Sequence, residues 1–555
     1  MIYYVIERET HINTPICLCE MCGIVCYLNP EQDLASLNTE FQKGRNRGPE
    51  FSCIKELNPY TVVGFHRLAI NGLTPKSNQP FQIENMTLVC NGEIYNYRKL
   101  YQLCNMEPTT DSDCEIILHL YKKYGILQTL ELIDGEFAFV LIDGDRLYAA
   151  RDPYGVRPLY WYSNDMSLGF SSEIKTLIGL HPDTIEHVVP GTYISCSLDT
   201  KVGWSRVLVD DSRAYFVPRH PTTIARFESY SKILYDPLVQ AVKKRVENTE
   251  RPVACLLSGG LDSSLVAAIA ASMVEVETYS IGIEGSEDLM YAQIVADHIG
   301  SKHTQILLTE RDFCSAIPEV VRAIESYDTT TVRASIGNYL IGKYIAANSK
   351  CKVVLNGDGS DEVAGGYLYM QSCPDALEFD KETRRLLREI HAFDVLRSDK
   401  SISSHGLEPR TPFLDRDFVD TYLSIPPQIR FHVQQNEMEK YLIRRAFADS
   451  GLLPKEVLWR KKEAFSDGVS KHARSLYLIL QEYADSFSFD ADCLARQVTH
   501  CPPKTKEQLY YRQLFEEAYP GQGKVVPHFW MPKYVTATDA SARTLSEYQK
   551  SHAKV

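Results

Sequence analysis

The 555-residue sequence lacks several features that would assign it to particular classes of protein. It has no run of about eighteen apolar residues, so we expect no membrane-spanning helix and no membrane partner. Glu7, Arg8 and Glu9 interrupt any apolar core in the first twenty residues, which excludes a secretory signal there. Basic charge is in deficit, because the net charge is −13. That balance argues against a nucleic-acid-binding surface.

The fifteen cysteines do not form the pattern of a secreted disulfide framework. Their number is odd and they are spread along the chain, which favours reduced thiols and a cytoplasmic location. Cys17, Cys19, Cys22 and Cys26 do fall close together. However, the apolar run Cys22–Leu28 predicts a buried strand on which Cys22 and Cys26 share a face about 13 Å apart. That separation disfavours a metal site.

The first part of the chain, over Cys22–Trp204, has the pattern of short strands separated by Gly, Asn and Asp turns. One helix is predicted over Asp113–Tyr124, with Ser112 as its N-cap and Gly125 as its stop. Strands with few helices predict a layered α+β domain. The expected strands are Cys22–Leu28, Thr61–Ile70, Thr87–Glu93, Glu136–Ile142, Arg146–Arg151 and Leu159–Tyr162.

From about Ser229 strands and helices alternate, and beyond residue 375 the chain is mostly helical. Alternation of this kind predicts βαβ units around a parallel sheet with helices on both faces. The expected strands are Val253–Leu257, Glu277–Ile283, Thr304–Leu308 and Lys352–Leu355, which closes the series. The expected helices are Leu265–Met273, Asp288–Ile299, 312–326 and 336–348.

A chain of this length exceeds the size at which a single core keeps growing, so two or three domains are expected. The segment Pro190–Arg226 contains prolines and few periodic positions, which places a boundary near residue 215. We expect an extension over residues 1–21, a first domain over 22–215, a second over 225–540 and a tail over 541–555.

The loop Leu257–Ser264, with the sequence Leu-Ser-Gly-Gly-Leu-Asp-Ser-Ser, joins an apolar strand to a helix. Backbone amides in such a loop bind phosphate, and Gly259 and Gly260 allow close approach of the anion. No Gly-Lys-Ser/Thr follows, so nucleotidyl transfer that releases pyrophosphate is favoured over transfer of the terminal phosphate. Asp262 would help to hold Mg²⁺ on the phosphates. The alternative is a simple Gly/Ser turn that starts a helix.

A second loop, Asn356–Glu362, follows another predicted parallel strand. Sites in parallel α/β sheets form at the carboxyl ends of strands, so both loops should face one crevice. Asp358, Asp361 and Glu362 are suited to Mg²⁺ coordination and to removal of a proton from an incoming amine. The alternative is a bare acidic turn.

Polar residues in the first half suit amide chemistry. The Asn91 side chain and the Gly92 N–H can form an oxyanion hole, although Asn-Gly alone is usually a turn. Arg67 can fork onto an α-carboxylate. Asp113 would meet an α-ammonium or serve only as an acidic residue in the first turn of a helix. The basic run Arg460–Glu463 is either solvated surface or brings a lysine to a leaving pyrophosphate.

Cys22 directly follows Met21. If the working chain begins at Cys22, one residue supplies both a thiolate nucleophile and a free α-amine to activate it, a pairing that suits amide hydrolysis. If Met1 and the following residues are retained, the amine is locked in a peptide bond and the pairing fails.

Taken together, these residues resemble glutamine-dependent asparagine synthetases, with a likeness from Met21 to the last residues. The resemblance implies an N-terminal-nucleophile glutaminase with αββα layers, followed by an α/β parallel-sheet synthetase domain of the ATP pyrophosphatase type. Gly64–Arg67 and the tail are closer to eukaryotic members. The motifs are Cys22-Gly23-Ile24, Asn91–Asn96, Ser258–Ser264, Tyr327–Ser335, Trp459–Gly468 and Trp530–Lys533.

The resemblance also implies a reaction. Cys22 would attack the side-chain amide of glutamine while Asn91 and Gly92 stabilise the oxyanion, and ammonia would pass through an internal tunnel. ATP would adenylate aspartate to β-aspartyl-AMP with release of pyrophosphate, Asp358 would act at the second site, and ammonia would complete asparagine. A homodimer is a candidate assembly.

The same resemblance implies the residues that bind each small molecule. Glutamine would contact Arg67, Leu68, Ala69, Ile70, Asn71, Asn91, Gly92, Glu93 and Asp113. ATP would contact Leu257, Ser258, Gly259, Gly260, Asp262, Ser263, Ile281, Asn356, Gly357 and Lys462. Aspartate would contact Thr329, Thr330 and Arg333, and Mg²⁺ would be held by Asp262 and Asp361.

Two features depart from the family pattern. Asp358 stands where the family has glutamate, which shortens the reach of the carboxylate while keeping its charge. The segment before Cys22 is absent from ordinary members, so we expect it to be removed or never translated. If Cys22 stays blocked, the enzyme would accept only free ammonia.

Three other hypotheses compete with this one. An ATP-dependent cyclase of the β-lactam synthetase kind shares the second half, but such enzymes lack the nucleophilic cysteine. Other glutamine amidotransferases share only the first half, and the loop at 258–264 argues against them. A regulatory pseudoenzyme would show no aspartate-dependent release of pyrophosphate.

Overall fold

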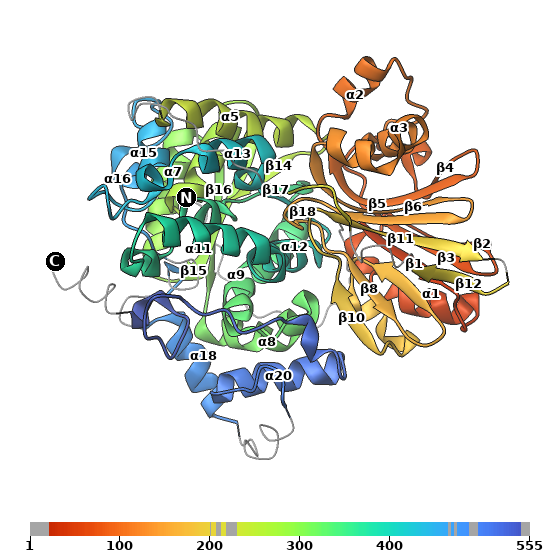
Figure 1. Ribbon diagram of the computed structural model, residues 1–555. Coiled ribbons are helices and arrows are strands. Elements are labelled where there is room, and N and C mark those ends of the chain that lie inside the picture. The colour runs from red at the N-terminus through yellow and green to blue at the C-terminus, as the bar shows by residue number, and fades with distance from the viewer. Residues whose placement is uncertain are drawn as a thin grey trace.

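The computed structural model describes residues 22–199, 201–206, 213–217, 230–463, 468–470, 474–487 and 498–545. The expected extension over 1–21 and residues 546–555 of the expected tail lie outside these ranges. Within the described residues the strands form three sheets, two antiparallel ones in the first half and a parallel one in the second (Figure 1).

The first antiparallel sheet has the order β10-β8-β9-β1-β3-β2. Its strands are β10 (Thr184–His187), β8 (Tyr160–Ser163), β9 (Leu168–Ser171), β1 (Gly23–Leu28), β3 (Thr61–Arg67) and β2 (Phe51–Asn58). The second has the order β12-β11-β7-β6-β5-β4, and β13 also pairs with β11. Its strands are β12 (Gly203–Arg206), β11 (Thr192–Asp199), β7 (Arg146–Arg151), β6 (Gly135–Asp143), β5 (Met86–Ile94), β4 (Phe81–Ile83) and β13 (Arg213–Ala214).

Alternation along β1 joins the layers of the first half. Ile24 and Cys26 belong to the apolar cluster between the two antiparallel sheets, whereas Val25 and Tyr27 pack in the cluster that contains Leu37 of α1 (Leu34–Gln42). Helices α2 (Tyr97–Cys104) and α3 (Ile116–Leu132) cover the second sheet. The predicted αββα layering is therefore confirmed.

In the described part of the chain, no group of three or more His, Cys, Asp and Glu side chains is arranged as a metal site.

The predicted helix at Asp113 is displaced. Ser112 caps a short 3-10 turn, Asp113–Glu115, by accepting a hydrogen bond from the Cys114 N–H, and α3 begins after that turn. The prediction that Gly125 ends the helix is confirmed, because the backbone of Gly125 is not helical. At Gly125 φ is 76°, and a second helical stretch of α3 follows this break, with residues such as Leu130 packed in the core.

The second half contains a parallel sheet in the order β16-β15-β14-β17-β18. Its strands are β16 (Lys302–Leu308), β15 (Val276–Ile283), β14 (Val253–Leu256), β17 (Val353–Leu355) and β18 (Glu408–Arg410). The prediction that the strand at 352–355 closes the series was wrong, because β18 pairs in parallel with β17. Glu-Pro-Arg has neither apolar alternation nor β-formers, and proline in a sheet is typical of an edge strand.

Helices cover both faces of this sheet, as predicted. Val253 and Cys255 of β14 pack with one set of helices and Ala254 packs with the other. The first set is α5 (Lys232–Glu247), α6 (Leu261–Ala271), α7 (Glu287–Ile299), α13 (Arg416–Ser424) and α15 (Tyr441–Ala446). The second set includes α8 (Glu310–Ile324), α9 (Thr329–Asn348) and α20 (Lys506–Ala518).

Helix α9 starts at Thr329, seven residues before the predicted start at 336. Its N-cap is Asp328, which accepts a hydrogen bond from the Thr331 N–H at 2.8 Å. The run of threonines, which are β-branched and weak helix formers, conceals this first part of the helix in the sequence. Within the described ranges, the other α-helices are α10 (Ser360–Ala364), α11 (Ala376–Glu389), α12 (Asp394–Ser403), α14 (Pro427–Arg430), α16 (Lys455–Leu458) and α18 (Leu476–Asp485).

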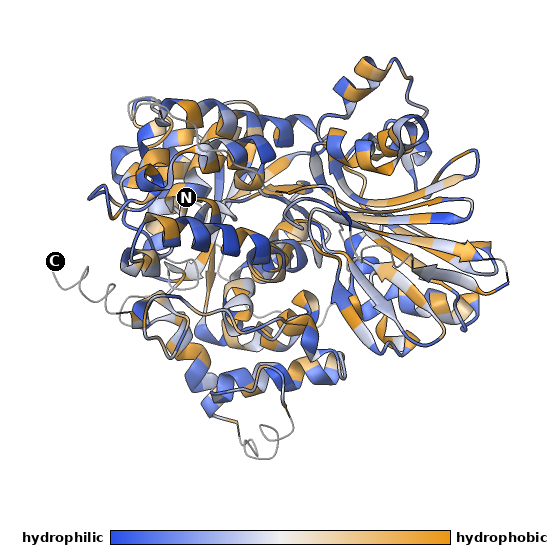
Figure 2. Cartoon of the chain, viewed as in Figure 1, coloured by the Kyte–Doolittle hydropathy of each residue, from blue (hydrophilic) through white to orange (hydrophobic). Residues whose placement is uncertain are grey.

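Hydropathy follows this layering. Figure 2 shows hydrophobic colour on parallel strands between the helices and hydrophilic colour on the visible face of α11. None of the helices in the described ranges combines the length and the apolar character that crossing a bilayer requires.

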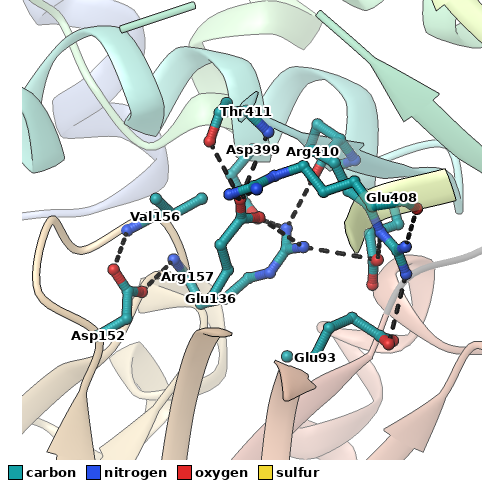
Figure 3. A network of polar contacts seen from close by, with 12 residues as sticks. Glu93, Glu136, Asp152, Val156, Arg157, Asp399, Glu408, Arg410 and Thr411 are labelled. Carbon is teal, nitrogen blue, oxygen red and sulfur yellow. Dashed lines mark hydrogen bonds and ion pairs between the residues drawn. The ribbon is translucent and has the colours of Figure 1, made fainter. Parts of the chain in front are cut away.

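A buried ionic network joins the two halves (Figure 3). Arg157, from the first half, lies 3.3 Å from both Glu136 and Asp399, and Glu136 also pairs with Arg245 of α5 at 2.7 Å. All four side chains are at most 4% exposed. Breaking one partner of such a buried pair leaves an uncompensated charge, so this network holds the halves in a defined orientation.

Candidate active sites

Cys22 lies at the start of β1, against the chain that leaves β3. Its Sγ is 3.4 Å from both the carbonyl oxygen and the backbone nitrogen of Leu68, so the thiol donates to one and accepts from the other. Burial raises the pKa of the Cys22 thiol above its ordinary value. Formation of the thiolate therefore needs a base.

The nearby histidine is not arranged as that base. Both ring nitrogens of His66 are engaged, one with Ser52 Oγ at 2.8 Å and the other with the Phe41 carbonyl at 2.9 Å. Burial also lowers the pKa of His66 to about 4. His66 is therefore not available as the base, and the activating role of the Cys22 α-amine stays a prediction.

The predicted oxyanion residues lie at the end of β5. Asn91 is 1% exposed, its Nδ2 is 3.5 Å from Ser172 Oγ, and its Oδ1 has no hydrogen-bond partner among the described residues. Ser172 Oγ in turn accepts from the Ile24 N–H at 3.2 Å, which brings Asn91 to the strand that carries Cys22. At Gly92 φ is +148°, and a Cβ there would lie 2.2 Å from the Glu136 carbonyl oxygen. Only glycine fits this approach.

The residues expected to bind glutamine are brought together around this strand end. Arg67 donates to the Thr74 carbonyl at 3.0 Å and to Asn78 Oδ1 at 2.6 Å, so its guanidinium supports the loop that follows β3. Leu68, Ala69, Ile70 and Asn71 are all buried.

Two carboxylates close the same site. Asp113 Oδ2 accepts from the Ile94 N–H at 2.6 Å, and burial raises the pKa of Asp113 to about 6. Glu93 Oε2 accepts from Asn71 Nδ2 at 2.7 Å. Burial, with Asp113 nearby, raises the pKa of Glu93 well above its ordinary value.

The second site is a cavity of about 230 Å³ at the carboxyl ends of the parallel strands. Both predicted loops line it, and Ser360 Oγ donates to Asp262 Oδ1 at 2.8 Å to join them. The expectation that the two loops face one crevice is confirmed. The predicted residues that line it are Leu257, Ser258, Gly260, Asp262, Ser263, Ile281, Thr330, Asn356, Gly357, Asp358, Asp361 and Lys462.

The first loop has the form of an anion cradle. Ser258 N–H and Oγ lie 3.2 and 3.0 Å from Ser263 Oγ, which folds the loop over the N-terminus of α6. At Gly259 φ is +70°, and a Cβ would lie 2.5 Å from the backbone nitrogen of Ala292. The loop can therefore approach α7 this closely only with glycine at that position.

Two lysines neutralise the acidic side of the cavity. Lys440 Nζ lies 2.6 Å from both Asp262 and Asp361, and Lys462 Nζ lies 2.5 Å from Asp361. Burial disfavours the charged form of Asp361, but the two lysines outweigh it and hold the pKa of Asp361 below its ordinary range. Because Asp262 and Asp361 converge on one ammonium group, they also fit a divalent cation that carries phosphates.

Asp358 faces the same cavity. One of its oxygens is paired with Arg397 at 3.0 Å, while its Oδ2 has no hydrogen-bond partner among the described residues. Arg397 also pairs with Asp394, which gives the carboxylate of Asp358 a fixed direction.

The residues expected to bind aspartate are arranged differently from one another. Thr330 lines both the large cavity and an adjoining cavity of about 110 Å³, which Arg333 also lines. The guanidinium of Arg333 is held by Glu507 at 2.6 Å and by Asp539 at 2.7 Å. Thr329 is buried as the first residue of α9.

Sequence reasoning missed Lys440, Asp394 and Arg397. Lys440 reaches Asp262 from 178 positions away in the chain, and no motif surrounds it in the sequence. Asp394 and Arg397 are spaced three residues apart on α12, a helical ion-pair spacing that is the single local signal available.

Comparison with known proteins identifies both halves. The family model for the glutamine amidotransferase domain matches residues 21–199, and the model for asparagine synthase matches 234–378 and 371–540. The asparagine synthetase [glutamine-hydrolyzing] of Gallus gallus is 41% identical over 568 residues, covering 96% of this chain and 100% of that protein. The protein of the same name from Homo sapiens is 42% identical over 567 residues, with the same coverage.

The chain belongs to the glutamine-hydrolysing asparagine synthetases.

The two sites described above lie in the two halves that the asparagine synthetase family models match. An antiparallel, layered amidotransferase half carries Cys22, and a parallel-sheet synthetase half carries the crevice. The competing cyclase hypothesis loses its basis, because the match covers both halves together.

Proposed function

We propose that this chain makes L-asparagine with glutamine as its nitrogen donor, and that each half of the chain catalyses a different step. Cys22 Sγ attacks the side-chain carbonyl carbon of glutamine, the tetrahedral oxyanion is held by Asn91 Nδ2 and Gly92 N–H, and ammonia leaves. Water then releases glutamate from the thioester. Arg67, Asn71, Glu93 and Asp113, with the backbone of Leu68 to Ile70, hold the glutamine.

In the crevice an oxygen of the aspartate β-carboxylate attacks the α-phosphorus of ATP, and pyrophosphate leaves. The loop from Leu257 to Ser263, with Ile281, Asn356 and Gly357, holds the nucleotide, and Lys462 steadies the leaving pyrophosphate. Asp262 and Asp361 would hold Mg²⁺, which neutralises the phosphate charge when bound. Aspartate would be bound or surrounded by Thr329, Thr330 and Arg333.

Ammonia crosses the interface between the halves and attacks the activated β-carbonyl, after which AMP leaves. The attacking nitrogen loses a proton, and Asp358 Oδ2 is the acceptor, since none of the described residues bonds that oxygen while the other one is paired with Arg397. The convergence of both loops on one cavity is the single observation that carries this proposal.

The products test it. Incubation with aspartate, ATP and glutamine labelled with ¹⁵N in its amide should give amide-labelled asparagine, AMP and pyrophosphate in equal amounts. Formation of ADP and phosphate, or nucleotide cleavage that does not depend on aspartate, would reject the adenylation step.

A second candidate function follows from the position of Cys22. If residues 1–21 are retained, its α-amine is blocked, and the chain would use only free ammonia. Intact mass of the purified protein, followed by assays with glutamine and with ammonium chloride, separates the two. An uncleaved chain that still hydrolyses glutamine would refute the requirement for a free amine.

We also propose a cytoplasmic location and a homodimer. In support of the first, the cysteines in the described ranges are all free thiols, as expected in a reducing compartment. Fractionation of cells tests the location, and light scattering of the purified protein tests the assembly.

A further inference from the structure

A short segment of the synthetase half, Asn248–Arg251, lies along the loop that is proposed to hold glutamine, Ala69–Gly72. The segment connects α5 to β14, and the loop follows β3 of the amidotransferase half. Their contacts therefore join residues that are nearly 180 positions apart in the chain, such as Asn71 and Asn248, which are separated by 177.

Each residue of the loop is bonded to this segment. The Ala69 carbonyl accepts from Arg251 Nε at 2.8 Å, and the Ile70 carbonyl accepts from the Glu250 N–H at 3.0 Å. Asn71 Nδ2 donates to the Asn248 carbonyl at 3.2 Å. The Gly72 N–H donates to Glu250 Oε1 at 2.7 Å.

The same segment also fixes a carboxylate of the glutamine site. Glu93 Oε2 accepts from Asn248 Nδ2 at 2.7 Å and lies 3.4 Å from Arg410 Nη2 of β18 (Figure 3). Asn248 is 2% exposed, so these bonds are shielded from water and form without competition from it. Of the three side chains that contact Glu93 Oε2, Asn248 and Arg410 come from the synthetase half and Asn71 comes from the amidotransferase half.

The loop begins at the nucleophile. Leu68, the residue before it, contacts Cys22 Sγ through both its N–H and its carbonyl group. The side chains of Leu68 and Ile70 lie in the apolar cluster of the synthetase half, together with Val253 and Leu257. Both the backbone groups of the loop and the apolar side chains of Leu68 and Ile70 are therefore anchored in the synthetase half.

We propose that Asn248 and Glu250 are positioning residues for glutamine, acting through Glu93 and Gly72, so that the glutamine site is complete only when the synthetase half is docked on it. The inference rests on the proposed glutamine-binding role of this loop. Neither residue touches the nucleotide crevice, so ATP binding does not depend on them.

Calorimetric titration of the full chain with L-glutamine, and separately with ATP and Mg²⁺, tests the proposal without requiring turnover. Glu250→Ala removes the acceptor of the Gly72 N–H and should weaken glutamine binding about tenfold, the value of a hydrogen bond to a charged group. Asn248→Ala should weaken it at least as much. Glu250→Gln keeps an acceptor oxygen and should restore glutamine affinity to within about twofold of the parent. The affinity for ATP should stay unchanged in all three.

Glu247→Ala is the matched control, because Glu247 is 61% exposed on the same stretch of chain and pairs with Lys243 at 3.7 Å. It should leave both affinities unchanged. Equal glutamine affinity in the parent, Glu250→Ala and Asn248→Ala would overturn the positioning role alone, and so would a parallel loss of ATP affinity, which would indicate misfolding. A parent chain that binds no glutamine would overturn the proposed function and this inference with it.

Discussion

Replacement of Glu136 by glutamine tests how strongly the buried network joins the halves. Glu136, on β6, is 3% exposed and accepts from Arg245 Nε and Nη2 at 3.1 and 2.7 Å. It also lies 3.3 Å from Arg157. Glu136→Gln keeps the shape of the side chain but leaves two buried guanidinium groups without one of their counter-charges, at a cost of about 3 kcal/mol.

The expected change in Tm follows from the size of the protein. Unfolding entropy of about 2.1 cal/mol/K per residue gives about 1 kcal/mol per degree for 555 residues. The variant should therefore unfold about 3 °C below the parent in differential scanning calorimetry, and its transition should broaden as the halves uncouple. A chain with two domains need not unfold in one step, so Tm of the first transition is the quantity to compare.

The dependence on pH gives a second check of the same interaction. Burial alone would raise the pKa of Glu136, but Arg245 and Arg157 outweigh it and lower that pKa below its usual 4.5. The stabilisation is therefore present above the unfolded-state pKa and disappears as the pH falls through the folded-state pKa. The difference in Tm between parent and variant should be full at neutral pH and shrink below about pH 4.5.

Glu84→Gln is the matched control, because Glu84 and its partner Lys122 are 62% and 51% exposed. An exposed pair contributes little, so Tm should stay within about 0.5 °C of the parent. A Tm of Glu136→Gln that equals that of the control would refute the argument that the interface depends on charge compensation.

Two further predictions concern the sites. Burial raises the pKa of Asp113 to about 6, and a protonated Asp113 cannot pair with the α-ammonium group of glutamine. KM for glutamine should therefore rise as the pH is lowered through that value, while KM for aspartate changes less. A KM for glutamine that does not change with pH would contradict the role assigned to Asp113. Lys440→Met removes the ammonium group that lies 2.6 Å from both Asp262 and Asp361. Release of pyrophosphate should therefore fall about a hundredfold, while glutamine hydrolysis stays as in the parent. An equal loss of both activities would indicate a general structural role for Lys440.

The parts of the fold that follow from local pattern are predictable from the sequence. The apolar run at 22–28 and the strand that precedes the Gly-rich loop both form strands where expected. Strand β18 is not predictable, because Glu-Pro-Arg becomes a strand only through its pairing with β17. The start of α9 is hidden for a related reason, since buried packing overrides the weak helix propensity of three threonines.

The residues of the two sites also fall into those that the sequence predicts and those that it does not. Both glycine-containing loops are visible in the sequence, because the approach of backbone to an anion requires glycine and the following helix is local. Lys440 and Asn248 are not visible, since each acts on a carboxylate, Asp262 or Glu93, that only the tertiary fold brings near it. A sequence motif records what a segment can bind, whereas the partners that orient it come from distant positions in the chain.

In the proposed mechanism Cys22 is needed only for the release of ammonia from glutamine, while the crevice makes asparagine from ammonia. Asparagine formation by Cys22→Ala, measured with glutamine and then with ammonium chloride as nitrogen donor, tests it most directly. Synthesis from glutamine should be lost, and synthesis from ammonia should stay within about twofold of the parent. Synthesis from glutamine that survives the substitution, or loss of synthesis from both donors in a folded protein, would contradict it.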